Sequence, residues 1–145
     1  MIKNRKNIAL ITGAGSGIGK ELAIQVSKMN YHVLLLGRAV KPLEKVHDSI
    51  KSDNLLNEFV SDKLQLISTT TREKSSFMGR MTHWLLNGKF ESITGTDLSI
   101  NTDRVMICGS LEMLQEHKEI CLQKGMMEGS NSAPGHFVIE KAFVD

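Results

Sequence analysis

Residues 12–19 read Thr-Gly-Ala-Gly-Ser-Gly-Ile-Gly and decide the fold that this sequence predicts. The apolar run at residues 8–11 precedes them, and an amphipathic segment follows them. Without a Cβ, the backbone can turn sharply at Gly13 and approach a ligand closely at Gly17, while Gly19 lets the following helix pack tightly on the strand. The free amides and the dipole at the start of that helix favour bound phosphate. This context predicts that a dinucleotide is bound by Thr12, Gly13, Ser16, Gly17, Ile18 and Gly19.

Four more apolar runs are typical of buried parallel strands, at residues 32–36, 64–67, 105–108 and 137–139. Segments with helical periodicity separate these runs. Strands that alternate with helices imply parallel pairing and right-handed crossovers. We therefore expect an α/β fold with a Rossmann-like, doubly wound parallel sheet of about five strands, in a single layered domain.

The predicted helices each carry an apolar face. In the first, which Asn30 would end, the face consists of Ile18, Leu22, Val26 and Met29. Pro42 suits the first turn of the second, whose inward face would consist of Leu43, Val46 and Ile50. The third is marked by Met78, Met81 and Leu85 and would be closed by Asn87-Gly88. The fourth covers residues 111–124, with Gly125 as its C-terminal cap.

The composition narrows the class of protein. A chain of 145 residues fits one domain, and its net charge of +2 with 5% aromatic residues gives no sign of nucleic-acid binding or of an anionic membrane surface. No apolar stretch approaches membrane-spanning length. Two cysteines, Cys108 and Cys121, are too few for a disulfide scaffold or a metal cluster. We expect a cytoplasmic protein without a metal site.

The end of the second strand bears on which dinucleotide is bound. An acidic residue there would accept hydrogen bonds from a ribose hydroxyl, which favours NAD. This chain instead has Gly37-Arg38, and a guanidinium at that point would attract a 2′-phosphate. The alternative is that Arg38 is an ordinary solvated surface residue. The sequence thus favours NADP(H) as the cofactor.

Residues 12–19, together with Leu34-Leu35-Leu36-Gly37-Arg38, resemble the start of the short-chain dehydrogenase/reductase family. The resemblance covers about the first third of the chain and implies a Rossmann fold that binds NADP(H). It would also imply a catalytic serine, a Tyr-x-x-x-Lys pair and an Asn-Ala-Gly turn further on. The sequence contains none of these, because its single tyrosine, Tyr31, is followed four residues later by Leu35.

The segment from residue 63 to residue 145 resembles a different family, the C-terminal part of bacterial ferredoxin–NADP⁺ reductases. Four motifs carry the resemblance in the order that the family has them. They are Thr70-Thr71-Arg72-Glu73, Gly79-Arg80, residues 105–113 (Val-Met-Ile-Cys-Gly-Ser-Leu-Glu-Met) and residues 134–140 (Pro-Gly-His-Phe-Val-Ile-Glu).

This second resemblance implies roles for individual residues. Arg72 and Arg80 would grip a 2′-phosphate, where two guanidinium groups give forked, charge-assisted hydrogen bonds. Cys108 and Glu140 would lie at the hydride-transfer site. The remaining residues that would contact the cofactor are Thr71, Gly109 and Met113. Lone cysteines and exposed arginines are common, so a small core residue and unrelated surface cations are the competing interpretations.

Three further features follow from the same resemblance. A short tail, residues 142–145, resembles one that shields the flavin in some bacterial members. The sequence has no Arg-x-Tyr-Ser/Thr stretch and no room for a flavin barrel, so FAD would come from a separate domain. Ferredoxin or flavodoxin is the implied redox partner.

We interpret the chain as a chimera whose halves, residues 1–50 and 63–145, together form one domain. The polar segment 51–62 would be the seam. A natural fusion, a degraded gene and an assembly error would each produce such a sequence. Because the halves come from different parents, their shared core risks cavities and strain, and we expect marginal stability.

Three functions remain open at this stage. The first, which the motifs favour, is the NADP(H)-binding part of a ferredoxin–NADP⁺ reductase-like oxidoreductase, inactive without an FAD domain. The second is a truncated short-chain dehydrogenase that lacks its catalytic tyrosine and lysine. The third is a non-catalytic nucleotide-binding chimera.

Overall fold

A computed structural model describes residues 7–60, 63–71, 74 and 76–140 of the chain. All five predicted strands are present, as β1 (Ile8–Ile11), β2 (His32–Gly37), β3 (Leu64–Thr70), β5 (Arg104–Cys108) and β6 (Phe137–Glu140). A sixth strand, β4 (Phe77–Met78), was not predicted. It forms because β3 runs three residues beyond its apolar run, and its last two residues pair with Phe77 and Met78.

The strands form one sheet in the order β4-β3-β2-β1-β5-β6, and every neighbouring pair is parallel. The chain builds outward from β1 through β2 to β4 and then crosses back to place β5 on the other side of β1. The strand order therefore reverses between β1 and β5, and a crevice is expected beyond the carboxyl ends of the strands at this point. The predicted Rossmann-like, doubly wound parallel sheet is confirmed, with six strands in the described part of the chain.

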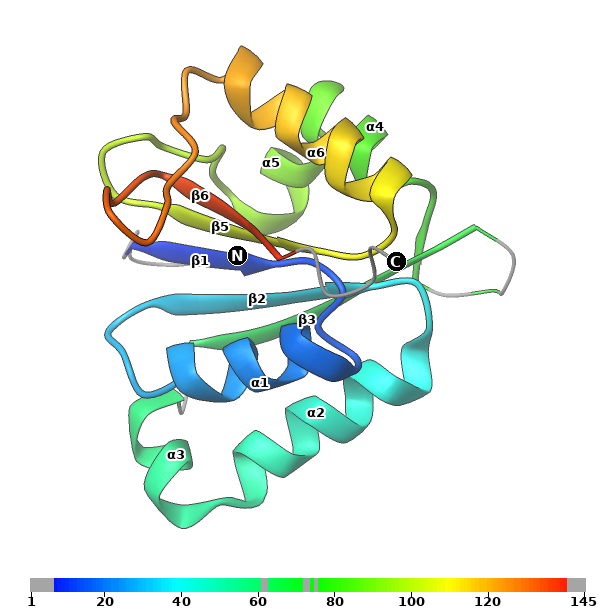
Figure 1. Cartoon of the computed structure of the whole chain (residues 1–145). Coiled ribbons are helices and arrows are strands. Elements are labelled where there is room, and N and C mark those ends of the chain that lie inside the picture. The colour runs from blue at the N-terminus through cyan, green and yellow to red at the C-terminus, as the bar shows by residue number, and fades with distance from the viewer. Residues whose placement is uncertain (1–6, 61–62, 72–73, 75, 141–145) are drawn as a thin grey trace.

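Helices cover both faces of the sheet (Figure 1). The helices α1 (Gly17–Val26), α2 (Val40–Ser52) and α3 (Asn54–Val60) lie on one face. The opposite face carries α4 (Met81–Leu86), α5 (Lys89–Thr94) and α6 (Leu111–Gln123). Each face has its own apolar core, which we call the first core, under α4–α6, and the second core, under α1–α3.

The apolar stripe predicted for the first helix is confirmed only at Val26. Ile18 and Met29 are exposed, and α1 ends at Val26 instead of running to Asn30. The buried positions are Gly19, Ala23 and Val26. The helix buries small residues because its first turn lies against the glycine turn, where a Cβ at position 19 would collide with the carbonyl of Gly13. In the first two turns the buried residues are therefore Gly19 and Ala23, each one position after the predicted Ile18 and Leu22.

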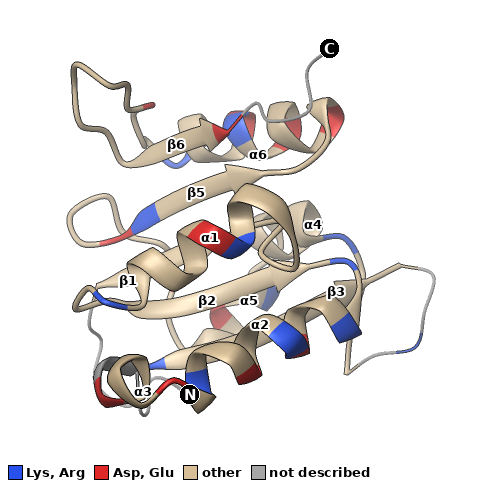
Figure 2. Cartoon of the chain, turned by 60° about the horizontal axis from the view of Figure 1, so that its bottom comes forward, with Lys and Arg blue, Asp and Glu red and all other residues tan. Residues whose placement is uncertain are grey.

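The predictions for the other helices are correct except at Met78. Leu43, Val46 and Ile50 form the buried face of α2 as predicted, and Figure 2 shows basic and acidic residues interspersed along this helix. Met78 is a correction, because it lies in β4 and is exposed, while α4 begins only at Met81. Asn87 and Gly88 close α4. Gly125, with φ of +79°, follows the end of α6.

The described part of the predicted seam, residues 51–60, is helical for most of its length although its sequence is irregular. Residues 54–60 form α3, which packs beside α2, and Leu56 contributes to the second core. Asp53 begins this helix by accepting hydrogen bonds from the amides of Leu55 and Leu56, both at 3.0 Å. A short helix with a single buried leucine is too brief for periodicity to reveal it.

Candidate functional site

A cleft opens at the carboxyl ends of β1, β2 and β3, next to the start of α6. Its larger cavity has a volume of about 540 Å³, and a second cavity of about 360 Å³ adjoins it. The two share four lining residues: Gly37, Arg38, Ser110 and Met113. This is the crevice expected where the strand order reverses, the position in which open α/β sheets bind their ligands.

The glycine turn forms one end of the cleft. Gly13 adopts φ of +61° and lies so close to β5 that a Cβ would come within 2.6 Å of the Cys108 carbonyl oxygen. Gly17 also has a positive φ, of +52°. The first hydrogen bond of α1 runs from the Lys20 amide to the Ser16 carbonyl at 3.1 Å, so the amides at positions 17–19 precede the helical bonding. The turn therefore has the close packing and open helix start that phosphate binding needs.

The side chain of Thr12 has a structural role. Its hydroxyl donates to the Cys108 carbonyl at 3.0 Å and accepts from the Cys108 amide at 2.9 Å. These bonds join the end of β1 to the end of β5 beneath the cleft. Thr12 lines the larger cavity, but its hydroxyl is already bonded to both the carbonyl and the amide of Cys108. Gly13 and Ser16 line the smaller cavity, whereas Gly17, Ile18 and Gly19 line neither.

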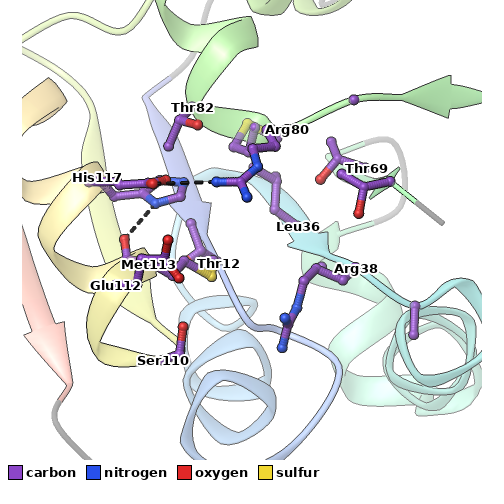
Figure 3. Close-up of a pocket in the computed structure, with 16 residues that line it drawn as sticks. Thr12, Leu36, Arg38, Thr69, Arg80, Thr82, Ser110, Glu112, Met113 and His117 are labelled. Carbon is purple, nitrogen blue, oxygen red and sulfur yellow. Dashed lines mark hydrogen bonds and ion pairs between the residues drawn. The ribbon is translucent and has the colours of Figure 1, made fainter.

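Two of the three predicted arginines line the cleft. Arg38 contributes to both cavities, and Arg80 lines the larger one together with Thr71. Figure 3 shows the two guanidinium groups directed to different parts of the cleft. Arg80 Nη1 lies 3.4 Å from Glu116 Oε1, an ion pair between half-exposed side chains. Arg72 lies outside the described residues, as does the tail at 142–145.

Cys108 and Glu140 are neighbours across the parallel pair formed by β5 and β6. Burial and, to a lesser extent, the nearby Glu140 carboxylate raise the pKa of the Cys108 thiol to about 11. The thiol is therefore protonated at neutral pH and is not a nucleophile. Neither residue lines the two cavities. Gly109 follows with φ of +153°, and a Cβ there would come within 2.6 Å of Met113 Sδ.

The sequence analysis missed several polar side chains that line the larger cavity. They are Thr69 and Thr82, together with three residues of α6: Glu112, Glu116 and His117. The signal for Glu116 and His117 was their spacing from the predicted Met113, because residues three and four positions apart share one helical face. Two glutamates beside two arginines make the charge of the cleft mixed.

Histidine 117 is the most buried of these, with 3% of its surface exposed. Its Nδ1 lies 2.8 Å from the carbonyl oxygen of Met113. Burial lowers its pKa, although that hydrogen bond and the nearby Glu116 act in the opposite direction. The ring is therefore neutral at physiological pH.

Comparison with known proteins finds two separate resemblances. The family model of the short chain dehydrogenase matches residues 7–76. A very-long-chain 3-oxoacyl-CoA reductase of Ajellomyces capsulatus is 48% identical over 44 residues, which cover 30% of this chain and 13% of that protein. The flavodoxin/ferredoxin–NADP reductase of Rhodobacter capsulatus is 40% identical over 111 residues, covering 74% of this chain and 41% of that protein. The chain thus spans less than half the length of these curated relatives.

The fold resembles that of a solved structure along nearly the whole chain. A ferredoxin NADP⁺ reductase from Neisseria gonorrhoeae, crystallised with FAD and NADP, superposes with a TM-score of 0.66 at 24% sequence identity. The match covers 96% of this chain and 56% of that one. The first part of the chain therefore resembles the short chain dehydrogenase in sequence, while the whole chain has the sheet of the reductase. None of the helices in the described residues has the length and apolar character needed to cross a membrane.

Proposed function

We propose that this chain is the NADP(H)-binding part of a ferredoxin–NADP⁺ reductase-like oxidoreductase. The observation that carries the proposal is the cleft itself, which lies beyond the carboxyl ends of the strands and is lined by the glycine turn, Arg38 and Arg80. The similarity to the Rhodobacter capsulatus reductase supports the same function.

The residues present fit a dinucleotide phosphate. Close backbone packing at Gly13 and Gly19 leaves the start of α1 open to a diphosphate, which needs amide donors and no side-chain bulk. Arg38 and Arg80 offer forked donors to further phosphate oxygens. Arg72 and Thr71 would complete the 2′-phosphate clamp beside Arg80. Glu116 must then share Arg80 with the phosphate or release it, because the two anions repel each other.

Cys108 and Glu140 would border the nicotinamide end of the cofactor. A buried thiol that keeps its proton adds no charge there, and the adjoining Gly109 lets the ring approach the backbone. A bound flavin divides a two-electron hydride into single electrons, chemistry that no amino-acid side chain supplies. FAD would be held by another domain or polypeptide, and ferredoxin or flavodoxin would be the partner.

Two secondary assignments complete the proposal. We place the junction of the halves in residues 51–62, although the two sequence matches together exceed the length of the chain and so overlap near its middle. We also place the protein in the cytoplasm, because Cys108 and Cys121 are both unpaired and buried.

The match to the short chain dehydrogenase favours one alternative, an alcohol or ketone oxidoreductase. That chemistry needs a tyrosine beside the nicotinamide. The single tyrosine, Tyr31, immediately precedes β2 and so lies at the amino edge of the sheet, opposite the cleft. Dehydrogenase turnover with an alcohol or ketone would favour this alternative over the reductase-like function.

A direct test is calorimetric titration of the 145-residue chain with NADP⁺ and with NAD⁺. We expect NADP⁺ to bind about tenfold or more tightly, because charge-assisted contacts to the 2′-phosphate are strong. Arg80→Ala should narrow this gap several-fold. Lys118→Ala is the matched control, because Lys118 is also an ion-paired cation, 2.7 Å from Glu128, and lies outside the cleft lining. Equal affinity for the two nucleotides would reject the phosphate clamp, and binding of neither would reject the proposed function.

A further inference from the structure

One buried polar atom in the cleft lacks a protein partner. His117 Nε2 has no hydrogen-bond partner among the described residues, although its ring is almost completely buried. Buried polar atoms are normally paired, and an exception in a native structure calls for an explanation. The residue lines the larger cavity, so the explanation can come from a ligand.

The other ring nitrogen determines what kind of ligand atom would fit. Nδ1 lies 2.8 Å from the Met113 carbonyl oxygen, which can only accept, so Nδ1 must carry the proton and donate. In the neutral ring Nε2 is then a lone-pair acceptor. Burial lowers the pKa of His117, which keeps the ring in this neutral form. Nε2 has almost no accessible surface, so a ligand can pair with it only if the side chains that cover it move aside, and the ligand must then supply an N–H or O–H group.

The surroundings of His117 suit a flat, largely apolar group. Met81, Met113 and Leu36 line the same cavity, and thioether side chains make favourable contacts with aromatic rings. Figure 3 draws His117 at the α6 side of the pocket, with Arg80 and Leu36 across from it. A purine whose ribose phosphate is held by Arg80 would thus reach a pocket with apolar walls and one acceptor.

We propose that His117 determines specificity for the adenine base, by accepting a hydrogen bond at Nε2 from the exocyclic 6-amino group. This inference rests on the proposed function, since it takes NADP(H) as the ligand. Phosphate oxygens cannot serve as donors to Nε2, and the 2′-hydroxyl of NADP(H) is esterified. Of the donors on the adenosine part, the amino group is the one that projects from the edge of the flat ring.

The test compares NADP⁺ with its unsubstituted purine analogue, in which a hydrogen atom replaces the 6-amino group and the ring nitrogens are unchanged. The two probes carry the same phosphates, riboses and nicotinamide. In the wild-type chain we expect the analogue to bind about tenfold more weakly, because Nε2 would be left without a donor. His117→Phe keeps a ring without Nε2 and should bring the two affinities together. His117→Gln, whose amide oxygen can accept, should restore part of the preference.

The outcomes separate this proposal from the one on which it rests. Equal binding of the two nucleotides by the wild-type chain would overturn the assignment of His117 and leave the NADP(H) function intact. An unchanged preference in His117→Phe, in a variant whose circular dichroism matches wild type, would do the same. Failure of the wild-type chain to bind NADP⁺ at all would overturn both proposals.

Discussion

The two faces of the sheet are assembled differently. The second core, under α1–α3, is drawn mainly from residues 9–56, so one half of the chain packs against itself. The first core, under α4–α6, joins Ile8, Leu10, Leu34 and Leu36 of the N-terminal half to Trp84 and Phe90 of the C-terminal half, among others. Packing between the two halves, which resemble different families, is therefore concentrated in the first core. The second core depends on it very little.

The two halves of the chain also contribute differently to the cleft. The N-terminal half contributes mainly backbone, through a turn whose glycines pack against the ends of β1 and β5. The C-terminal half contributes most of the polar side chains, including Arg80, Glu116 and His117. A glycine turn is thus transferable between proteins as a backbone unit, whereas the side chains that we propose to contact the ligand depend on the rest of the fold.

The largest expected effect compares two adjacent leucines of β2. Leu34 and Leu35 are both fully buried, but Leu34 lies in the first core and Leu35 in the second. Replacing either with alanine should cost about 2–5 kcal/mol of unfolding free energy, measured by urea denaturation. We expect the smaller loss from Leu34→Ala, because a truncation costs less where packing is looser.

This comparison has a built-in control, because the two substitutions remove the same atoms from the same strand. Tryptophan fluorescence reports on the first core, where the single tryptophan, Trp84, is buried. An equal loss from both variants, together with a cooperative melt at an ordinary mesophile midpoint, would contradict the marginal stability expected of a hybrid core.

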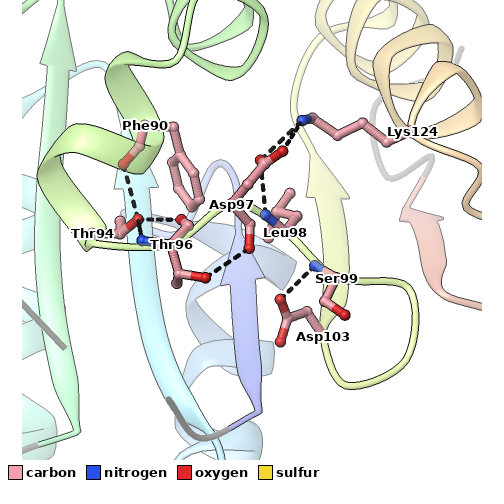
Figure 4. Close-up of polar contacts among 8 residues, drawn as sticks. All are labelled: Phe90, Thr94, Thr96, Asp97, Leu98, Ser99, Asp103 and Lys124. Atoms are coloured by element: carbon pink, nitrogen blue, oxygen red, sulfur yellow. Dashed lines mark hydrogen bonds and ion pairs between the residues drawn. The ribbon is translucent and has the colours of Figure 1, made fainter. Parts of the chain in front are cut away.

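A somewhat smaller effect is expected at the polar joint between the halves. Asp103 is fully buried and accepts hydrogen bonds from the Ile8 amide at 2.9 Å, the Ser99 amide at 2.7 Å and the Thr102 hydroxyl at 2.9 Å. Figure 4 shows the bond to Ser99. Asp103→Ala would leave three donors, including the buried Ile8 amide, without their acceptor and should cost about 3 kcal/mol of unfolding free energy.

Asp97 is the matched control for that substitution. It lies in the same loop and pairs with Lys124 at 2.8 Å, but its side chain is half exposed (Figure 4). Asp97→Ala should cost less than about 1 kcal/mol in the same urea titration, because exposed ion pairs contribute little. Similar losses from the two variants would show that Asp103 does not tie β1 to the C-terminal half.

The smallest effect is a pH dependence of the unfolding free energy, which we expect from His117. Its pKa is lower in the folded protein than the ordinary value of 6.5. The unfolded chain therefore takes up the proton first as the pH falls, and the stability that neutral His117 contributes above pH 6.5 is lost below it. The slope from one group is at most about 1.4 kcal/mol per pH unit.

Urea titrations between pH 7.5 and pH 5 on wild type and His117→Gln would measure this contribution. The variant should lose less stability than wild type as the pH is lowered, since glutamine does not titrate. Parallel curves for the two proteins would show that His117 is not held neutral by burial.

The sequence by itself determined the alternation of strands and helices and the place of the glycine turn. These features are local, because a buried strand, a capped helix or a turn that needs positive φ leaves its mark within a few residues. The face of α2 was predicted correctly for this reason. The face of α1 was not, because the close approach of Gly19 to Gly13 overrode the simple apolar spacing.

Only the tertiary structure decided which side chains share the cleft. Arg38 and Arg80 come from elements separated by a crossover, and β3 was predicted without the short strand β4 that extends the sheet before Arg80. His117 looks in the sequence like any residue on the inner face of a helix. Its unpaired nitrogen matters because parallel strands bring their carboxyl ends to one edge of the sheet, and α6 starts there and borders the space that they leave.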